Sequence, residues 1–367
     1  MKEKRYYIAP GRINIIGEHT DYNDGYVLPA AINRFTQIGI LEIDGTKVRV
    51  NSKKYGTAEF DVSNIEKTND WTDYIKGIFW VLKNEKNISF PGLEIEIKSN
   101  IPEGAGLSSS AALEVSVITA LDDYLELALT EDEKIKYARK AENDFVGVQC
   151  GIMDQFIAVR GKKEHAIFLD TKTLKYEYVP VKTGNYSLIV FNSNVDHKLS
   201  GGEYNKRRQE AHDALKELGK DSYRDVKLTE ILMNRSSMSE IGFKRAMHVI
   251  SENERVLEAV DMLNHSNFEN LGRILIQSHE SLAMDYEVSC EEIDFIVNTL
   301  RYKDGVTGCR MIGAGFGGSV LAICEKEKLE MIKNGLSKAY KDEFDIELDS
   351  YEIEIEGGAR RTQEQVL

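Results

Sequence analysis

This sequence of 367 residues is poor in the features that define several large classes of protein. It has only four cysteines, none of them in a CxxC pair, so it indicates neither a zinc site nor a disulfide framework, and we interpret all four as reduced thiols. It has five prolines, no low-complexity stretch and no internal repeat. No run approaches the ~18 apolar residues that a membrane span needs, and no signal peptide is recognisable at the start. We therefore expect a soluble, cytoplasmic protein without a membrane partner.

Acidic residues outnumber basic ones. The 61 Asp and Glu against 47 Lys and Arg give a formal net charge of −14. A surface of this charge repels DNA and RNA, so we expect no nucleic-acid partner, although a few local donors can still bind a small polyanion such as a nucleotide. Hydrophobic residues make up 42% and charged residues 29%, which is ordinary for a globular protein and excludes a mainly disordered chain.

Strand-like and helix-like segments alternate along the chain, which predicts a mixed α and β class, α+β or α/β. In residues 93–98, LEIEIK, apolar and charged side chains alternate, which predicts a strand with one solvent-exposed face. Thr130 and Glu133 predict the capping box of a helix. Further strands are expected at 166–169, 186–191 and 319–324, and further helices at 71–85, 109–126, 203–218, 245–264, 268–284 and 327–340.

The length predicts about two domains, at ~150 residues each. The composition does not shift anywhere along the chain. The best candidate for a boundary is the short polar turn KTGN at residues 182–185, between two predicted strands. We therefore place the domains at 1–182 and 183–367.

The first motif, Gly11 to Pro29, reads GRINIIGEHTDYNDGYVLP. Its polar side chains include Arg12, Glu18, His19, Asp21 and Tyr22. Carboxylates and an imidazole at this density suit a hydroxyl-rich ligand, since one carboxylate can accept hydrogen bonds from two sugar hydroxyls. The alternative is a solvated polar loop with His19 exposed at the surface, and composition alone favours that alternative.

The second motif, Pro102 to Ala112, reads PEGAGLSSSAA and lies between a predicted strand and an apolar helix. Its glycines let the backbone approach a ligand closely, and a helix N-terminus with free N–H groups favours a phosphate. Serine hydroxyls add donors or a magnesium ligand. The alternative is a serine-capped helix after a flexible loop. No GK[ST] follows the glycines, so this is not a Walker loop.

The third motif, Gly313 to Gly318, reads GAGFGG and fits the pattern G-x-G-x-x-G. A dinucleotide-binding fold needs a helix after the glycines, but the following run SVLAIC predicts a strand. A protein kinase needs VAIK, HRD and DFG elements, none of which is present. Two interpretations are left: a tight glycine turn between strands, or a backbone loop that closes over another part of the site.

Together these three motifs resemble those of the GHMP small-molecule kinases, and the first resembles the galactokinase version. Two further segments, AENDFVGVQCGIMDQF at 141–156 and NSNVDHKLSGGEYNKRR at 192–208, are also similar to galactokinase segments and follow in the same order. The resemblance runs from about Ile8 to Gly318. Five ordered matches make coincidence a poor explanation.

The resemblance implies a catalytic pair. Asp154, in GIMDQ, corresponds to the family's catalytic aspartate, which faces the anomeric hydroxyl of the sugar, and Arg12 corresponds to the arginine beside it. A cation beside a carboxylate favours the ionised form, and a guanidinium can stabilise charge on the transferring phosphoryl group. Whether the aspartate removes the proton or orients the hydroxyl is open, because phosphoryl transfer depends mainly on positioning and electrostatics. Without the resemblance, Asp154 would be interpreted as part of a capped turn.

The resemblance also implies three groups of binding residues. The sugar-binding positions are Glu18, His19, Asp21, Gly151 and Tyr204. The phosphate loop, which would bind ATP, consists of Gly104, Gly106, Leu107, Ser108, Ser109 and Ser110. Mg²⁺ would be held by Ser110 and Glu142, although Glu142 on its own looks like an ordinary exposed helix residue. The adenine contacts are not placed, because Trp71, Tyr74 and Trp80 suit the core side of a helix equally well.

The implied fold is the GHMP kinase fold, with an N-terminal domain like domain 2 of ribosomal protein S5 and a ferredoxin-like C-terminal domain. The implied reaction converts ATP and α-D-galactose into ADP and α-D-galactose 1-phosphate, the first phosphorylation of galactose catabolism. The alternatives are a kinase for a related sugar, such as N-acetylgalactosamine, galacturonate or L-arabinose, and a non-catalytic galactose sensor. The presence of Arg12, Ser110, Ala111 and Asp154 favours an enzyme. The small-molecule substrates are the expected partners, and the sequence indicates no protein partner.

Overall fold

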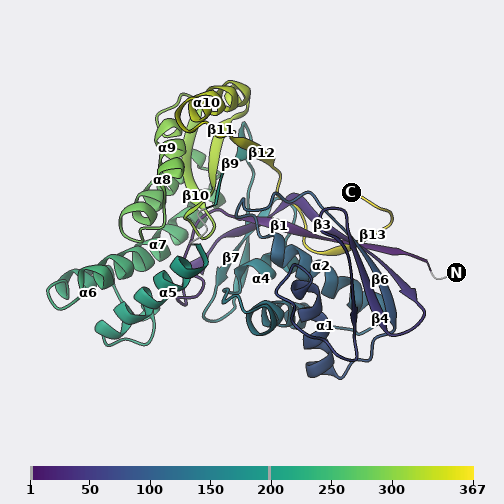
Figure 1. Cartoon of the computed structure of the whole chain (residues 1–367). Helices are drawn as coiled ribbons and strands as arrows, with labels where there is room; N and C mark the ends of the chain where they lie inside the picture. The colour runs from purple at the N-terminus through teal and green to yellow at the C-terminus, as the bar shows by residue number, and fades with distance from the viewer. Residues whose placement is uncertain (1–2, 197–199) are drawn as a thin grey trace.

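The computed structural model describes residues 3–196 and 200–367, whose helices pack around three β-sheets (Figure 1). The strands of the first sheet are β1 (Arg5–Asn14), β3 (Pro29–Ile43), β4 (Lys47–Ser52), β5 (Gly56–Asp61), β6 (Gly92–Ser99) and β13 (Arg360–Thr362). Those of the second sheet are β9 (Tyr186–Asp196), β10 (Val306–Ile312), β11 (Gly317–Glu325) and β12 (Asp349–Ile353), and those of the small third sheet are β2 (Tyr26–Val27), β7 (His165–Asp170) and β8 (Tyr176–Pro180). The α-helices are α1 (Asp73–Lys86), α2 (Ser109–Tyr124), α3 (Glu131–Lys140), α4 (Met153–Arg160), α5 (Ser200–Glu217), α6 (Leu228–Met233), α7 (Glu240–Asn264), α8 (Phe268–Met284), α9 (Glu291–Leu300) and α10 (Leu329–Phe344).

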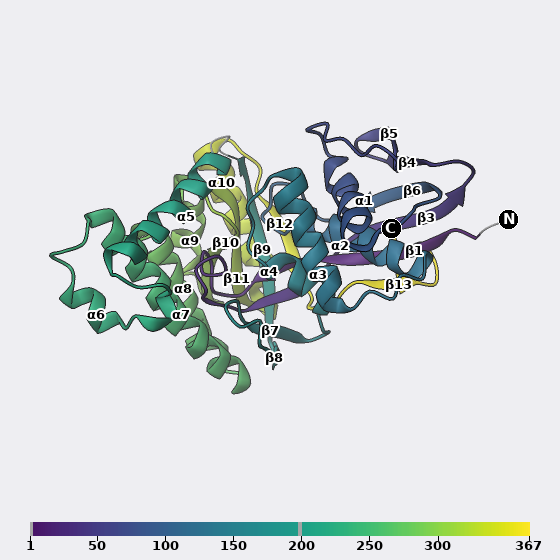
Figure 2. The same cartoon turned by 90° about the horizontal axis from the view of Figure 1, so that it is seen from below.

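The first sheet has the strand order β13-β1-β3-β6-β4-β5, and the helices α1 to α4 cover one of its faces (Figures 1 and 2). Its strand pairs are antiparallel except for β4 with β6. In β6, Leu93, Ile95 and Ile97 are buried, while Glu94 and Glu96 are partly exposed. This alternation follows from the two-residue period of a strand and confirms the prediction from LEIEIK.

On this face, α1 and α2 lie within two residues of the helices predicted at 71–85 and 109–126, whereas α4 was not predicted. α2 packs directly on β1 and β3, and α1 and α3 pack against α2. α3 begins with the predicted capping box: Thr130 Oγ1 accepts a hydrogen bond from Glu133 N, and the Glu133 carboxylate accepts one from Thr130 N. These two bonds satisfy N–H groups that a helix end otherwise leaves free. The chain then continues into a π-helical turn, η1 (Ala141–Val146), which changes the side chains that face the core.

The second sheet has the strand order β10-β11-β9-β12, and all of its pairs are antiparallel. Along the chain, β9 is followed by helices, then by β10 and β11, then by α10 and β12, which is the βαββαβ pattern of a ferredoxin-like domain. The apolar run from Val320 to Cys324 is wholly buried in β11, so the strand predicted from SVLAIC is confirmed. The short helices α6, η2 (Tyr223–Asp225) and η3 (Lys326–Lys328) link larger elements of this half.

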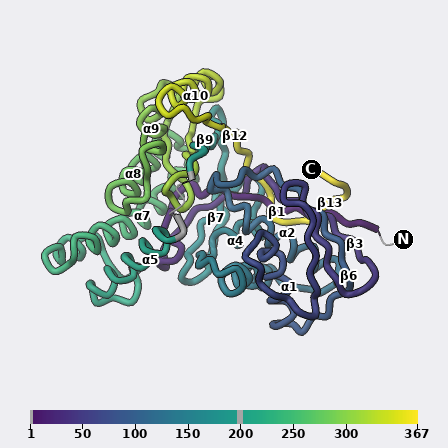
Figure 3. Tube along the Cα trace, viewed as in Figure 1, coloured from purple at the N-terminus to yellow at the C-terminus, as the bar shows by residue number. Residues whose placement is uncertain are grey.

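The end of the chain returns to the first sheet. After β12, Ile355 pairs with Ile32, and β13 then pairs with β1 at the outer edge of the sheet (Figure 3). Both termini therefore lie at the end of the molecule that is remote from α5 and α6 (Figure 1). The boundary at residue 182 falls in the link between β8 and β9 and stays a prediction.

Two sequence-based expectations concern the environment of the chain. In the described part of the chain, every helix is too short or too polar to cross a lipid bilayer. All four cysteines are free thiols, as the sequence predicts. Two of them, Cys309 and Cys324, are buried in the second sheet, where burial raises the pKa of both thiols and keeps them protonated.

Candidate active site

Apolar residues of the first two motifs, and the residue directly before the third, share one buried cluster that contains residues of both the N-terminal and the C-terminal half of the chain. Ile13 and Ile16 come from the first motif, Ala105 and Leu107 from the second, and Ile312 directly precedes the third. All five side chains are 5% exposed or less. Because close packing holds these side chains at fixed distances, the polar residues between them are brought to one place.

The third motif is the link between the other two. Gly313 N donates to the Glu18 carboxylate at 2.9 Å, and Ser319 Oγ donates to the Ala105 carbonyl oxygen at 2.8 Å. The motif turns between β10 and β11, so the prediction of a glycine turn between strands is confirmed. Gly315 has a φ of +86°, and a Cβ there would lie 2.3 Å from Val288 O, so this turn requires glycine.

Asp154 and Arg12 form a bidentate ion pair. Arg12 lies on β1 and Asp154 in the first turn of α4, and Arg12 Nε and Nη2 donate to the two carboxylate oxygens at 2.8 and 2.9 Å. Such a pair fixes orientation as well as distance. A further bond from Arg12 Nη1 to Gly106 O ties the guanidinium to the second motif. Burial lowers the pKa of Arg12, but Asp154 and Glu18 more than offset this, and the pKa lies above its ordinary value.

Ser108 occupies the position before α2 without capping it. Its φ is +62°, in the left-handed region, and its side chain makes no bond to the first N–H groups of the helix. Ser108 Oγ instead donates to Oδ2 of Asp154. The alternative interpretation of the second motif as a serine-capped helix is therefore wrong at this residue. The N–H groups at the start of α2 stay available for an anion.

The other phosphate-loop residues differ in exposure. Gly104 is exposed, with open space where a Cβ would lie, and Gly106 and Ser109 are partly exposed. Leu107, by contrast, is 1% exposed and packs in the apolar cluster described above. Only the backbone of Leu107 can therefore face a ligand, whereas the glycines leave room for close approach.

Glu142 lies on η1 and is buried, so the alternative interpretation as an exposed helix residue is wrong. Its Oε2 accepts from Gln155 Nε2 at 2.6 Å and from Cys150 Sγ at 3.2 Å, and the Ser110 hydroxyl also hydrogen-bonds to it. Burial raises the pKa of Glu142 above its ordinary value. The same Gln155 amide donates to Glu114 on α2 at 3.2 Å, so one amide joins two buried carboxyl groups.

This cluster fits a magnesium ion. Oε1 of Glu114 is buried without a hydrogen-bond partner among the described residues, and burial together with nearby Glu142 raises the pKa of Glu114 well above its ordinary value. Paired buried carboxyls of this kind need a proton or a cation to neutralise them. Ser110 and Glu142 offer the oxygen donors that Mg²⁺ prefers, and two protein ligands leave positions for water and phosphate. Within residues 3–196 and 200–367, no group of three or more His, Cys, Asp or Glu side chains is arranged to hold a metal ion.

Glu18 is held by residues from both halves. Arg310, wholly buried on β10, places Nη2 at 3.2 Å from Glu18 Oε1, and its Nη1 donates to the carbonyl oxygens of Asn14 and Ile15 at 3.1 and 2.9 Å. The Asn14 side chain donates to the other oxygen of Glu18. Burial raises the pKa of Glu18, and Arg310 and Arg12 offset part of the rise.

His19 is also buried, so the alternative of a surface histidine is wrong. Burial lowers the pKa of His19 to about 3, and the imidazole is neutral at pH 7. Because the Ala314 carbonyl oxygen can only accept, Nε2 at 3.2 Å carries the proton, and Nδ1 accepts from the Tyr22 hydroxyl at 2.6 Å. The Tyr286 hydroxyl lies 3.1 Å from Tyr22 and donates to it in turn. This chain of bonds fixes the ring orientation of His19.

Tyr204, on α5, joins the same group of rings. Its ring centroid lies 5.8 Å from that of His19 and 5.4 Å from that of Tyr22. Asp21, the next candidate sugar residue, lies against the backbone of Gly151. Burial raises the pKa of Asp21 to about 6, and repulsion from nearby carboxylates adds to the rise. Residues 197–199, within the fifth matching segment, lie outside the described residues.

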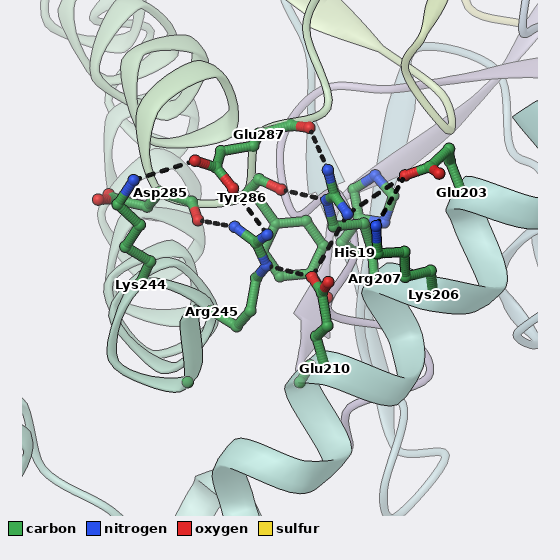
Figure 4. A network of polar contacts seen from close by, with 12 residues as sticks. His19, Glu203, Lys206, Arg207, Glu210, Lys244, Arg245, Asp285, Tyr286 and Glu287 are labelled. Atoms are coloured by element: carbon green, nitrogen blue, oxygen red, sulfur yellow. Dashed lines mark hydrogen bonds and ion pairs between the residues drawn. The ribbon is translucent and has the colours of Figure 1, made fainter. Parts of the chain in front are cut away.

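A network of hydrogen bonds and ion pairs from two arginines holds the segment that carries Tyr286 (Figure 4). Arg207 on α5 donates to the carbonyl oxygens of Tyr286 and Glu287 at 2.9 and 3.1 Å. Arg245 on α7 donates to the carbonyl oxygen of Asp285 at 2.5 Å and to the Glu287 carboxylate at 2.7 Å. Both arginines are buried, so this contact between two helices and one short segment is well shielded from solvent.

Some of the residues that contact the candidate site were not singled out from the sequence. Glu114 lies four positions after Ser110 on α2, and this i, i+4 spacing is a signal that could have indicated it. Arg310 and Tyr286 carry no local signal. Their contacts with Ile15 and Tyr22 span 295 and 264 positions of the chain, so only the folded structure places them at the site.

Known families match the chain over these same segments. Residues 73–162 match the family described as the GHMP kinases N terminal domain, and residues 256–342 match the GHMP kinases C terminal family. Residues 2–40 match the galactokinase galactose-binding signature. A mevalonate kinase from Methanococcus jannaschii, 18% identical, shares the fold with a TM-score of 0.71 over 96% of this chain and 98% of its own. The fold and the three-motif site thus define a GHMP kinase.

Closer relatives narrow the family. A galactokinase from Thermotoga neapolitana is 50% identical over 96% of this chain and 99% of its own length. One from Pyrococcus furiosus is 41% identical over 92% of this chain and 93% of its own. The crystal structure of Lactococcus lactis galactokinase in complex with galactose has a TM-score of 0.94 at 36% identity and covers 98% of this chain and 95% of that one. The chain therefore belongs to the galactokinase family of the GHMP kinases and is an ATP-dependent sugar kinase.

Proposed function

We propose that Asp154 and Arg12 form the catalytic pair of this kinase. The reaction transfers the terminal phosphoryl group of ATP to the anomeric hydroxyl of α-D-galactose and yields ADP and α-D-galactose 1-phosphate. The observation that carries the assignment is the bidentate contact between the two side chains, which places a carboxylate and a guanidinium at the meeting point of the three motifs. A cation there can stabilise the charge of the transferring phosphoryl group.

The contacts of Asp154 leave room for the sugar. A carboxylate has about four acceptor positions. Arg12 Nε occupies one on Oδ1, while Arg12 Nη2 and Ser108 Oγ both donate to Oδ2. One acceptor position on Oδ1 is left for the anomeric hydroxyl. From there Asp154 can orient the hydroxyl toward the phosphoryl group and accept its proton as the new phosphorus–oxygen bond forms.

The second motif and α2 would bind the phosphates of ATP. The backbone from Gly104 to Ser109 and the N–H groups at the start of α2 offer donors at the positive end of a helix. Ser110 and Glu142 would hold Mg²⁺, which when bound neutralises charge on the phosphate oxygens. The support for this assignment is the buried, orphaned oxygen of Glu114 next to Glu142.

The sugar would lie against the first motif, with Glu18, Asp21 and the neutral His19 directed at its hydroxyls. Glu18 and Asp21 can only accept when ionised, and the Tyr204 hydroxyl can donate or accept. Both ring nitrogens of His19 already have protein partners, so a sugar hydroxyl would accept from Nε2 in place of the Ala314 carbonyl oxygen. The raised pKa of the buried Glu18 and the partly buried Asp21 supports a ligand that supplies donors, because hydroxyls would replace the water that these carboxylates have lost. Glu18 also disfavours galacturonate if it faces C6, since two carboxylates would repel.

An assay for ADP release over a panel of sugars tests this function. The panel is galactose, glucose, N-acetylgalactosamine, galacturonate and L-arabinose, each with ATP and Mg²⁺. We expect galactose to give the highest kcat/KM. A higher value for another member would reassign the substrate to that sugar. Galactose binding without any turnover would favour the sensor alternative, which the intact Arg12–Asp154 pair disfavours.

Two further assignments stay proposals. A cytoplasmic location is supported by the four free thiols, which suit a reducing compartment. Galactose and ATP are the partners that the family supports. Fractionation of cells that produce the chain, with a periplasmic marker as reference, tests the location.

A further inference from the structure

Helix α7 contacts the backbone of the sugar loop, the part of the first motif from Gly17 to Tyr26. Glu252 accepts a hydrogen bond from Gly17 N at 3.0 Å, and Asn253 Oδ1 accepts one from Tyr26 N at 2.8 Å. Between them, His248 Nε2 donates to the carbonyl oxygen of Glu18 at 3.1 Å. These contacts join residues that lie 227 to 235 positions apart in the sequence, so only the tertiary structure brings them together.

The three side chains are buried along the same two turns of α7. His248 and Glu252 lie at i and i+4, a spacing that directs side chains to the same side of a helix, and Asn253 directly follows Glu252. They are 0%, 0% and 8% exposed, although each is polar. Burying polar groups on a helix is costly unless they gain hydrogen bonds, and their partners here are backbone groups of the sugar loop.

Two further side chains, one on α8 and one on α7, donate hydrogen bonds to the Glu252 carboxylate. Ser278 Oγ donates to Oε1 at 2.7 Å, and Arg255 Nε donates to Oε2 at 2.7 Å. Although burial opposes ionisation, Arg255 and other donors lower the pKa of Glu252 to about 2. The carboxylate is therefore ionised at pH 7 and forms a charge-assisted bond to the N–H group of Gly17.

Gly17 cannot be replaced at this contact. Its φ is +105°, and a Cβ would lie 2.6 Å from Tyr26 O and 3.1 Å from Val256 on α7. Thr20 Oγ1 closes the loop by donating to the carbonyl oxygens of Gly17 and Tyr26, at 2.8 and 2.6 Å. The loop is thus drawn together at its two ends, and α7 holds both of these ends.

We propose that His248, Glu252 and Asn253 are positioning residues for sugar recognition. They set the place of the backbone from which Glu18, His19 and Asp21 project, without touching the sugar themselves. The proposal rests on the function proposed above, because it concerns the same sugar site. A displaced loop would misdirect the acceptors of the site while the phosphate loop, held by other contacts, keeps its place. The expected effect is therefore confined to the sugar.

The test uses the full chain with Asn253→Ala, its conservative counterpart Asn253→Asp, and Glu254→Ala as the matched control. Glu254 is the next residue on α7 and is exposed. We expect Asn253→Ala to raise KM for galactose and the calorimetric Kd for galactose without nucleotide by about tenfold. KM for ATP and kcat should stay within about twofold. Asn253→Asp keeps the acceptor for Tyr26 N and should restore most of the loss, and Glu254→Ala should match the wild type.

Glu252→Gln serves as the second variant should Asn253→Ala not fold. The amide oxygen can keep the bond to Gly17 N, but the amide nitrogen would face the donor of Arg255, so we expect a smaller shift in the same direction. A lower Tm with unchanged KM and Kd for galactose in both variants would overturn the proposal and leave the three residues a purely structural role. A wild-type chain that neither binds nor phosphorylates galactose would instead overturn the proposed function.

Discussion

The backbone of Gly151 lies directly against the carboxylate of Asp21. A Cβ on residue 151 would lie 1.7 Å from Oδ2 of Asp21 and 2.4 Å from its Cγ. Contacts this short are not tolerated, so any side chain at position 151 must push the Asp21 carboxylate away. Gly151 lies in the segment between η1 and α4, so the backbone of this segment limits the positions that the Asp21 carboxylate can occupy. The relationship also explains why the two residues belong to one candidate sugar site.

Gly151→Ala should therefore impair galactose recognition without preventing folding. A misdirected, partly buried carboxylate costs about 1–3 kcal/mol, which corresponds to about fivefold to a hundredfold in kcat/KM for galactose. Glucose, which differs at C4, should be affected less, so the ratio of the two sugars should fall. Gly202→Ala on α5 is the control, because its Cβ would meet open space. An unchanged ratio in Gly151→Ala would show that Asp21 does not read the sugar.

Asp154→Asn should lose turnover while it keeps sugar binding. The amide nitrogen cannot accept from Arg12 Nη2 and Ser108, so the guanidinium loses its alignment. The amide is also uncharged, so the remaining oxygen is a weaker acceptor for the anomeric hydroxyl and its proton. We expect kcat to fall by about a hundredfold to ten-thousandfold. The measurement is kcat together with the calorimetric Kd for galactose. Turnover near that of the wild type in a folded variant would contradict the catalytic assignment, and an equal loss of binding would give Asp154 a ground-state role.

Glu142→Gln should weaken the use of magnesium. The substitution keeps the shape of the side chain and replaces the oxygen ligand that η1 buries beside Ser110. The Mg²⁺ concentration for half-maximal rate should rise at least about tenfold, with galactose affinity in the absence of nucleotide unchanged. Asp144→Asn, exposed on the same turn, should behave as the wild type. If both variants titrate like the wild type, the metal is held elsewhere.

The activity on galactose should decline below pH 6. Burial and the neighbouring carboxylates Asp154 and Glu18 raise the pKa of Asp21 to about 6, so this side chain takes up a proton within the range of an assay. Once protonated, it offers fewer acceptor positions to sugar hydroxyls, and kcat/KM should fall by about tenfold per pH unit. In Asp21→Asn, the overall kcat/KM should be lower, and this limb of the pH profile should be absent.

The same shift predicts the sign of a stability effect. Because the pKa of Asp21 is higher in the folded than in the unfolded chain, folding favours the protonated form. The stability that this contributes is present at acidic pH and is lost as the pH rises through about 6. Asp21→Asn should therefore raise Tm relative to the wild type at pH 8 and have little effect at pH 4. Thermal unfolding at the two pH values measures this, and an equal shift at both would contradict it.

The sequence by itself determined the local elements and the residue types of the site. The alternation in LEIEIK predicted β6, the pair Thr130 and Glu133 predicted the start of α3, and the short apolar run after GAGFGG predicted a buried strand rather than a helix. Each depends on neighbours within a few positions, which a sequence pattern records directly. The ordered motifs likewise placed Arg12 and Asp154 in a known family, because their residue types and order are themselves sequence.

The tertiary structure alone decided which of these residues meet. Arg12 and Asp154 are 142 positions apart, and the burial of Glu142 depends on a π-helical turn that helical spacing does not predict. Ser108 looked like a helix cap, but its hydroxyl turns to Asp154 because that partner is brought within reach only by folding. The physical reason is the same in each case. A side chain's partner, exposure and pKa are set by what packs around it, and packing between distant segments leaves no periodic trace in the chain.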